Sequence, residues 1–126
     1  MNAAPRILIV DDSDEARAVL AIALHTIAGA SVEVAASAEQ ALALIAAETV
    51  DVLLTDVRMG GMSGFELLTV LRERGLWPAR GAVVISGETD PELRERAIEH
   101  GAAAFFTKPF STGEVRKSVI SLLRSS

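Results

Sequence analysis

The stretch DVLLTDVRMGGMSGFELL, residues 51–68, decides the fold. An apolar run of strand length, expected over 50–55, leads to a carboxylate, Asp56, where glycines turn the chain toward an apolar helical pattern. Most of the apolar runs along the chain are continuous, as is typical of strands covered on both faces of a parallel sheet. Only one run alternates, SVEVA, which predicts an edge strand. The four further runs are RILIV at 6–10, SVEVA at 31–35, AVVIS at 82–86 and AAFFT at 103–107.

Helical patterns separate these runs. Apolar residues recur at three-and-four spacing over 16–27 and 38–45, which predicts one apolar face on each helix. Three helix starts show the spacing of a capping box: Ser37 with Gln40, Thr89 with Glu92 and Ser111 with Glu114. The alternation predicts a single α/β domain over residues 1–126, a doubly wound parallel sheet with helices on both faces.

The composition narrows the classes of function. A chain of 126 residues with 50% hydrophobic content is large enough for one core, and its charge of −5 without a Lys/Arg run argues against direct nucleic-acid binding. No cysteine is present, so disulfides and thiolate zinc sites are excluded, and the two histidines are far apart. No apolar stretch approaches the roughly 20 residues of a membrane span. We expect a soluble, cytoplasmic protein with no membrane partner.

Polar groups follow four of the five predicted strands. In doubly wound sheets, ligands bind outside the carboxyl ends of the strands, so these groups are expected at one rim. Crowded carboxylates need a compensating cation, and ligation by oxygen alone favours Mg²⁺. In FFTKPF, Pro109 restricts the backbone of the preceding lysine, Lys108. The ammonium of that lysine would be a second cation at the rim, in addition to Mg²⁺. The rim residues are Asp11, Asp12, Asp56, Ser86 and Lys108.

Each of these groups also has a purely structural interpretation. The acid pair at 11–12 would be an N-cap pair before the first helix, in competition with Ser13. Asp56 would be a turn acid and Ser86 a turn hydroxyl, while Lys108 would be a solvated surface lysine. All these interpretations would have to hold together, on four strands and at the same strand ends, so the combined pattern favours a site.

The motifs resemble the receiver domain of two-component response regulators along essentially the whole chain: ILIVDDSDEAR, DVLLTDVRMGGMSGFELL, VVISGETD and FFTKPF. The resemblance implies a flavodoxin-like strand order 2-1-3-4-5. It also implies that Asp56 accepts a phosphoryl group from a sensor histidine kinase or a histidine phosphotransfer protein. Such a domain is a signalling switch with self-catalysed phosphotransfer and slow autodephosphorylation, not a turnover enzyme.

The resemblance also implies the role of each site residue. Asp12 would bind Mg²⁺ directly and Asp11 mostly through water, while Asp56 and the backbone carbonyl of Arg58 would complete the set. Lys108 would neutralise a phosphoryl oxygen, which fits a reaction that depends on positioning and charge neutralisation.

A switch follows by the same resemblance. Ser86 would move toward the phosphoryl group and Phe105 would rotate inward, which alters the surface of the fourth helix, fifth strand and fifth helix. Phe105 as an ordinary sheet-face aromatic is the alternative. That surface would contact a downstream protein target or a fused output domain, and a weak homodimer through it is compatible with the resemblance. Partner specificity is expected around the first helix, at exposed positions such as Arg17.

The chain departs from the family in the loop after Asp56. Many relatives have proline at the position of Gly60 and an acid at that of Ser63, so we expect a more flexible loop. Arg58 and Glu88 would flank the reacting group, and we hypothesise that they pair across its mouth and restrict the attacking water.

Other function classes stay open. A hydrolase of the phosphoaspartate type shares the acidic nucleophile and Mg²⁺, but Arg58 stands where such enzymes carry a second acid. A degenerate interaction module would lack the complete set of site residues, and a nucleotide or flavin carrier would need a glycine-rich loop after the first strand. Whether the chain acts alone or within a longer regulator or hybrid kinase is open.

Overall fold

A computed structural model of the protein describes residues 4–87 and 89–125. Strands and helices alternate along them, and the strands form a parallel sheet in the order β2-β1-β3-β4-β5. The predicted order and the edge position of the alternating strand are therefore confirmed. The elements are β1 Arg6–Val10, α1 Asp14–His25, β2 Ser31–Ala35, α2 Ala38–Ala47, β3 Val52–Asp56, α3 Gly64–Glu73, β4 Gly81–Ser86, α4 Glu92–Glu99, β5 Ala104–Thr107 and α5 Thr112–Arg124.

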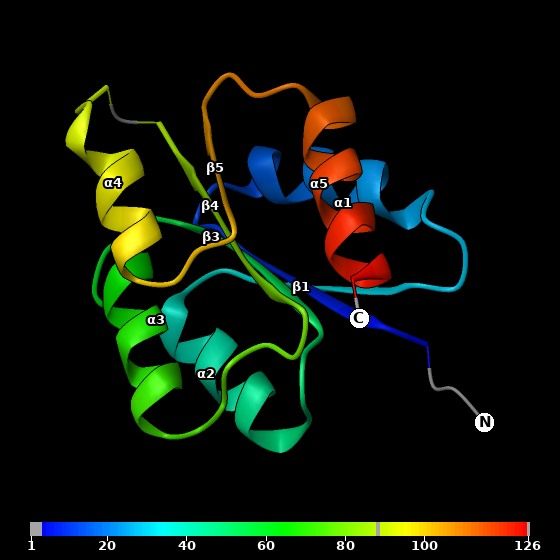
Figure 1. The fold of residues 1–126 in the computed structure, drawn as a ribbon, viewed down its shortest axis with the longest axis horizontal. Helices are drawn as coiled ribbons and strands as arrows, with labels where there is room; N and C mark the ends of the chain where they lie inside the picture. The colour runs from blue at the N-terminus through cyan, green and yellow to red at the C-terminus, as the bar shows by residue number, and fades with distance from the viewer. Residues whose placement is uncertain (1–3, 88, 126) are drawn as a thin grey trace.

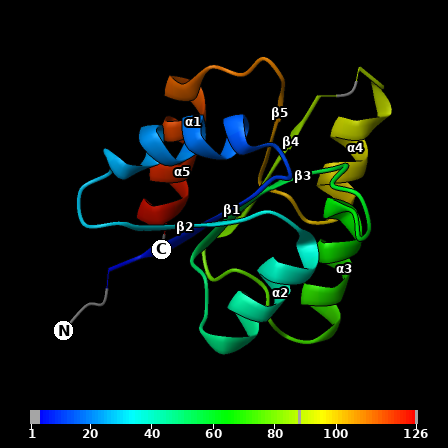
Figure 2. The same ribbon diagram turned by 180° about the vertical axis from the view of Figure 1, so that it is seen from behind.

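The sheet lies between two helical layers (Figure 1). Helices α1 and α5 cover one face, and α2, α3 and α4 cover the other, as the view from behind also shows (Figure 2). Successive strand residues point to opposite faces, so Ile7 and Ile9 join the α1/α5 core, whereas Leu8 and Val10 join the other core. This explains why the central strands are continuously apolar. None of the helices in the described ranges is long and apolar enough to cross a lipid bilayer.

Strand β3 begins and ends later than predicted. Pairing with β1 starts at Val52, opposite Ile7, so Val50 and Asp51 precede the strand. At the other end, Asp56 pairs with Ile85 of β4. Asp56 is therefore the last residue of a buried strand and not a residue of the following turn, so its backbone is fixed by the sheet.

Serine caps begin most of the helices. The Ser37 and Ser111 hydroxyls accept hydrogen bonds from the backbone N–H groups three residues later, at 3.1 and 3.2 Å, which confirms the hydroxyl half of each predicted capping box. The Gln40 side chain accepts instead from the Ala36 N–H, at 2.7 Å. Ser63 and Glu66 form a complete capping box at α3 that the sequence prediction missed, although the S-x-x-E spacing is present.

One alternative interpretation and one expectation about helix starts are wrong. The acid pair at 11–12 does not cap α1, because Ser13 is its N-cap and accepts from the Ala16 N–H at 3.2 Å. Thr89 does not cap α4 either. Pro91 stands at the N-cap without a side-chain cap, and Asp90 accepts from the Glu92 N–H at 2.9 Å. The first correction leaves the acid pair available for other chemistry.

Candidate functional site

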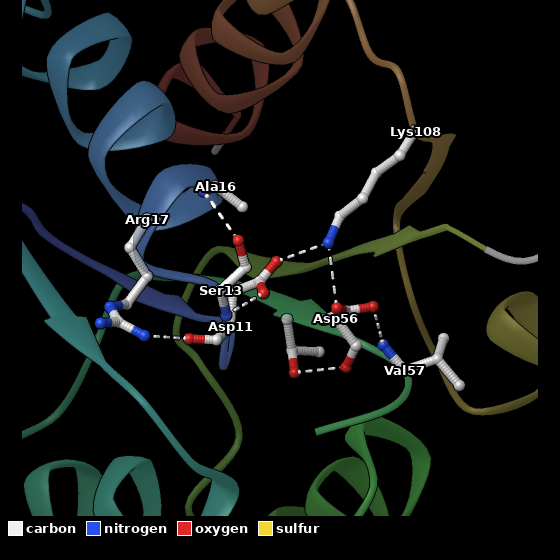
Figure 3. Close-up of polar contacts among 8 residues, drawn as sticks. Asp11, Ser13, Ala16, Arg17, Asp56, Val57 and Lys108 are labelled. Atoms are coloured by element: carbon white, nitrogen blue, oxygen red, sulfur yellow. Dashed lines mark hydrogen bonds and ion pairs between the residues drawn. The ribbon is translucent and has the colours of Figure 1, made fainter. Parts of the chain in front are cut away.

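The carboxyl ends of four adjacent strands bring the predicted polar groups together, and Figure 3 shows Asp11, Asp56 and Lys108 among them. Asp11 directly follows β1, and Asp56 and Ser86 are the last residues of β3 and β4. Lys108 directly follows β5, and its backbone N–H donates to the Ser86 carbonyl at 2.8 Å. These residues, separated by up to 97 positions in the sequence, form one site at the rim of the sheet.

Lys108 joins the two buried carboxylates. Its ammonium donates to Asp11 Oδ2 at 2.9 Å and to Asp56 Oδ2 at 3.0 Å. The Lys108 side chain is 26% exposed, whereas those of Asp11 and Asp56 are 2% and 10% exposed. The solvated-lysine interpretation is therefore wrong, because Lys108 neutralises charge inside the rim.

Three carboxylates have the chemistry of a divalent-metal site. Ligand oxygens of Asp11, Asp12 and Asp56 all lie within 4.8 Å of one another. Asp12 is exposed and faces solvent, and the other two are buried. Hard oxygen donors of this kind suit Mg²⁺, which keeps several waters and uses one or two carboxylates. The residues present therefore fit the ion that the sequence predicted.

Neighbouring residues fix the Asp56 carboxylate and the backbone that carries it. The Val57 N–H donates to Asp56 Oδ1 at 2.7 Å, and the Thr55 hydroxyl donates to the Asp56 carbonyl at 2.9 Å. Helix α3 begins so close to this strand end that a Cβ at Gly64 would lie 2.0 Å from the Asp56 carbonyl oxygen. The sequence prediction missed Thr55 and Gly64, and no spacing rule marks such a close approach.

Burial and charge shift the pKa values of both partners. Burial raises the pKa of Asp56 above 3.8, although the hydrogen bond from Lys108 lowers it; nearby Asp11 raises it further. Burial lowers the pKa of Lys108, but hydrogen bonds to Asp11 and Asp56 outweigh this and raise it above 10.5. The lysine therefore remains a cation at neutral pH, which the neighbouring carboxylates require.

The predicted switch residues are both buried. Ser86 is 1% exposed at the rim, and Phe105 is 8% exposed within the core beneath α4. The guanidinium of Arg94 lies over the Phe105 ring, 5.1 Å from its centroid. Phe105 thus points inward here, and its rotation stays a prediction about another state.

The predictions about the loop after Asp56 stay predictions. Arg58 is exposed, two residues beyond Asp56. Glu88 lies outside the described residues, so its pairing with Arg58 stays a prediction. Gly60 and Gly61 have φ values of 60° and 85°, conformations that glycine adopts readily.

Arg17 is not the exposed residue that was expected. Its side chain is 17% exposed, and one guanidinium nitrogen donates to the Asp11 carbonyl at 2.7 Å. The other contacts the exposed Asp14 carboxylate. The exposure of Arg17 was expected from the resemblance alone, and no sequence pattern indicated that its side chain would turn toward the rim.

Comparisons with known proteins agree with this geometry. The family model described as the response regulator receiver domain matches residues 7–120. The two-component response regulator ORR11 of Oryza sativa subsp. indica is 34% identical, over 92% of this chain and 79% of that protein. The C4-dicarboxylate transport transcriptional regulatory protein DctD of Rhizobium meliloti is 32% identical over 94% of this chain, which spans only 25% of DctD. The structure of Vibrio cholerae chemotaxis protein CheY4 superposes with a TM-score of 0.84 at 31% identity, over 95% of this chain and 99% of that one.

Proposed function

The chain belongs to the response regulator receiver family, and on that premise we propose that it is a phosphorylation-dependent switch whose phosphoryl acceptor is Asp56. The observation that carries the proposal is the bridge from Lys108 to two buried carboxylates on neighbouring strands. A structural ion pair needs one carboxylate. Here two buried carboxylates lie beside a third, exposed one. In such a site one carboxylate oxygen can attack a phosphoryl group while nearby cations neutralise the charge on the phosphoryl oxygens.

The proposed reaction moves a phosphoryl group from a phosphohistidine to the acceptor. An oxygen of the Asp56 carboxylate forms the new bond to phosphorus as the phosphorus–nitrogen bond breaks. The electron pair of that bond stays on the imidazole nitrogen of the donor, which then takes a proton from water. The Val57 N–H and the Lys108 ammonium hold the attacking carboxylate in place.

Charge neutralisation completes the site. Asp11, Asp12, Asp56 and the backbone carbonyl of Arg58 would hold Mg²⁺, which when bound supplies positive charge to the phosphoryl oxygens. Lys108 supplies a second cation. Its ammonium would move from the unmodified Asp56 carboxylate to the new phosphoryl group.

The conformational change caused by phosphorylation would then be transmitted from the rim through β4 and β5. In the proposed switch, the Ser86 hydroxyl moves to the phosphoryl group and Phe105 repacks beneath α4. The altered surface would bind a downstream protein or an output domain of the same polypeptide. The donor would be a sensor histidine kinase or a histidine phosphotransfer protein in the cytoplasm, and the switch would reset by slow autodephosphorylation.

A phosphorylation experiment tests the assignment. The protein is mixed with Mg²⁺ and a small acyl phosphate, and intact-mass and peptide mass spectrometry locate the product. We expect one phosphoryl group on Asp56, and its formation should depend on Mg²⁺.

Two variants give the controls. Asp56→Asn should remain unmodified. Asp51→Asn alters a carboxylate just before the same strand, at the opposite rim, where its oxygen accepts from the Arg6 N–H at 2.7 Å; this variant should be modified like the wild type. Modification at another residue, or none in a folded protein, would contradict the proposal. Steady release of phosphate from small phosphomonoesters would favour the hydrolase instead.

A further inference from the structure

Asp12 is the member of the acidic cluster whose side chain is least restrained. It is the most exposed of the three clustered carboxylates, and its side chain makes no hydrogen bond or ion pair with the residues at 4–87 and 89–125. A flexible ligand lowers metal affinity, because its freedom is lost on binding. Only the backbone on either side of Asp12 can hold its carboxylate near the others.

That backbone is restrained mainly at Asp11. The Asp11 N–H donates to the Ala35 carbonyl at 3.2 Å, and the side-chain Oδ1 accepts from the Ser13 N–H at 2.9 Å. The remaining polar group is the Asp11 carbonyl, which belongs to the peptide that joins the two acids. The Arg17 guanidinium donates to that carbonyl at 2.7 Å (Figure 3).

We infer that Arg17 is a positioning residue for the metal ligand Asp12, and that it acts by fixing the orientation of the Asp11–Asp12 peptide. This inference rests on the proposed function. A peptide is planar, so a donor that fixes its carbonyl also fixes the direction in which the next residue leaves. Arg17 comes from the first turn of α1, and the Ser13 cap holds that turn.

The geometry favours this role over a surface ion pair. Asp14, the other partner of the guanidinium, is 94% exposed, and such pairs contribute little. The Arg17 side chain, in contrast, is only 17% exposed and reaches over its own helix turn to the strand end. The exposed pair with Asp14 therefore contributes little, and the bond from Arg17 to the Asp11 carbonyl does the positioning.

The direction in which Mg²⁺ affinity changes when Arg17 is replaced distinguishes a positioning role from a purely electrostatic one. Arg17→Met keeps the apolar stem but removes both the charge and the donor. If Arg17 acted only as a nearby cation, its loss would strengthen Mg²⁺ binding, because repulsion is removed. If Arg17 fixes the peptide, its loss should weaken Mg²⁺ binding by about 10-fold, the scale seen for outer-shell residues of metal sites.

The experiment measures the Mg²⁺ dissociation constant by calorimetry or amide chemical shifts at two salt concentrations, with circular dichroism to confirm folding. We expect weaker binding by Arg17→Met at both salts and partial recovery by Arg17→Lys, whose ammonium still donates to a carbonyl. Asp14→Asn is the matched control and should bind within about twofold of the wild type, since exposed pairs are weak. Without Mg²⁺, the Asp12 and Ser13 amide resonances should shift in Arg17→Met.

Two outcomes overturn the inference, and they are distinguishable. If the wild type binds Mg²⁺ but Arg17→Met and Arg17→Lys bind it equally or more tightly, the positioning role is wrong and the proposed function stands. If the folded wild type binds no Mg²⁺, the metal part of the proposed function fails, and the positioning role fails with it.

Discussion

Asp56 is subject to opposing effects, because the fold buries its carboxylate and also places a lysine beside it. Burial raises its pKa above 3.8, against the effect of Lys108. As the pH rises from 3.8 through the raised pKa, the unfolded chain loses its proton first. The folded state therefore loses stability across this window and does not regain it at neutral pH. The acceptor is kept at a cost to the fold.

Asp56→Asn should consequently stabilise the protein in the absence of divalent ions. The neutral amide has nearly the same shape, and Lys108 keeps Asp11 as its partner. The gain should be larger at pH 7 than at pH 4, because only the wild type acquires a buried charge as the pH rises through the raised pKa of Asp56. Urea unfolding of both proteins in a chelator, from pH 4 to pH 8, measures it. A difference that does not change with pH would show that burial of the charge is not the cause.

Sequence reasoning at the residue scale identified the groups that end strands, because strand ends are visible as the ends of apolar runs. Asp11, Asp56 and Lys108 were found in this way and lie within hydrogen-bonding distance of one another or of a shared partner. Arg17 was misplaced, since the direction of a long flexible side chain depends on a carbonyl that no sequence pattern marks. Thr55 was overlooked because one hydroxyl within a buried strand carries no spacing signal.

At the scale of elements, the junction between β3 and α3 is the tightest part of the site. The Gly64 N–H donates to the Val57 carbonyl at 2.8 Å, so the loop between them closes on itself. A methyl group at Gly64 would overlap the Asp56 carbonyl oxygen. Gly64 is required because no side chain fits beside the Asp56 carbonyl, whereas Gly60 is favoured because its φ is positive.

Gly64→Ala should therefore destabilise the protein by about 2 kcal/mol or more, the scale of overpacking in a close contact. Gly113→Ala is the matched control near the start of α5, where the nearest atom to a new Cβ is Ser111 Oγ at 3.7 Å. There, alanine should stabilise by up to about 1 kcal/mol through helix propensity. Thermal unfolding compares the two variants. Equal effects would mean that helix α3 can move away from the strand, contrary to the tight junction.

At the scale of the whole molecule, the alternation of elements predicted the layers, and resemblance supplied the strand order. Continuous apolar runs indicated strands covered on both faces, and residues such as Ile7 and Leu8 do face opposite helical layers. The start of α4 was less predictable, because the Asp90 carboxylate, and not the Thr89 hydroxyl, accepts from the Glu92 N–H beside Pro91. The fold thus followed from periodicity, whereas the site required the topology that brings four strand ends together.

If the converging strand ends bind Mg²⁺ as proposed, the stability of the whole domain should depend on the ion. An ion that binds only the folded rim stabilises the protein by about 1.4 kcal/mol at ten times its dissociation constant. For a domain of 126 residues, this should raise the melting temperature by about 5 °C. Asp12→Asn should lose most of the rise, because it removes an exposed ligand and leaves the core intact. Differential scanning calorimetry with Mg²⁺ and with Na⁺ at equal ionic strength measures the effect, and Asp90→Asn, an exposed acid on another loop, serves as the control. An undiminished rise in Asp12→Asn would place the ion elsewhere and separate the acidic rim from metal binding.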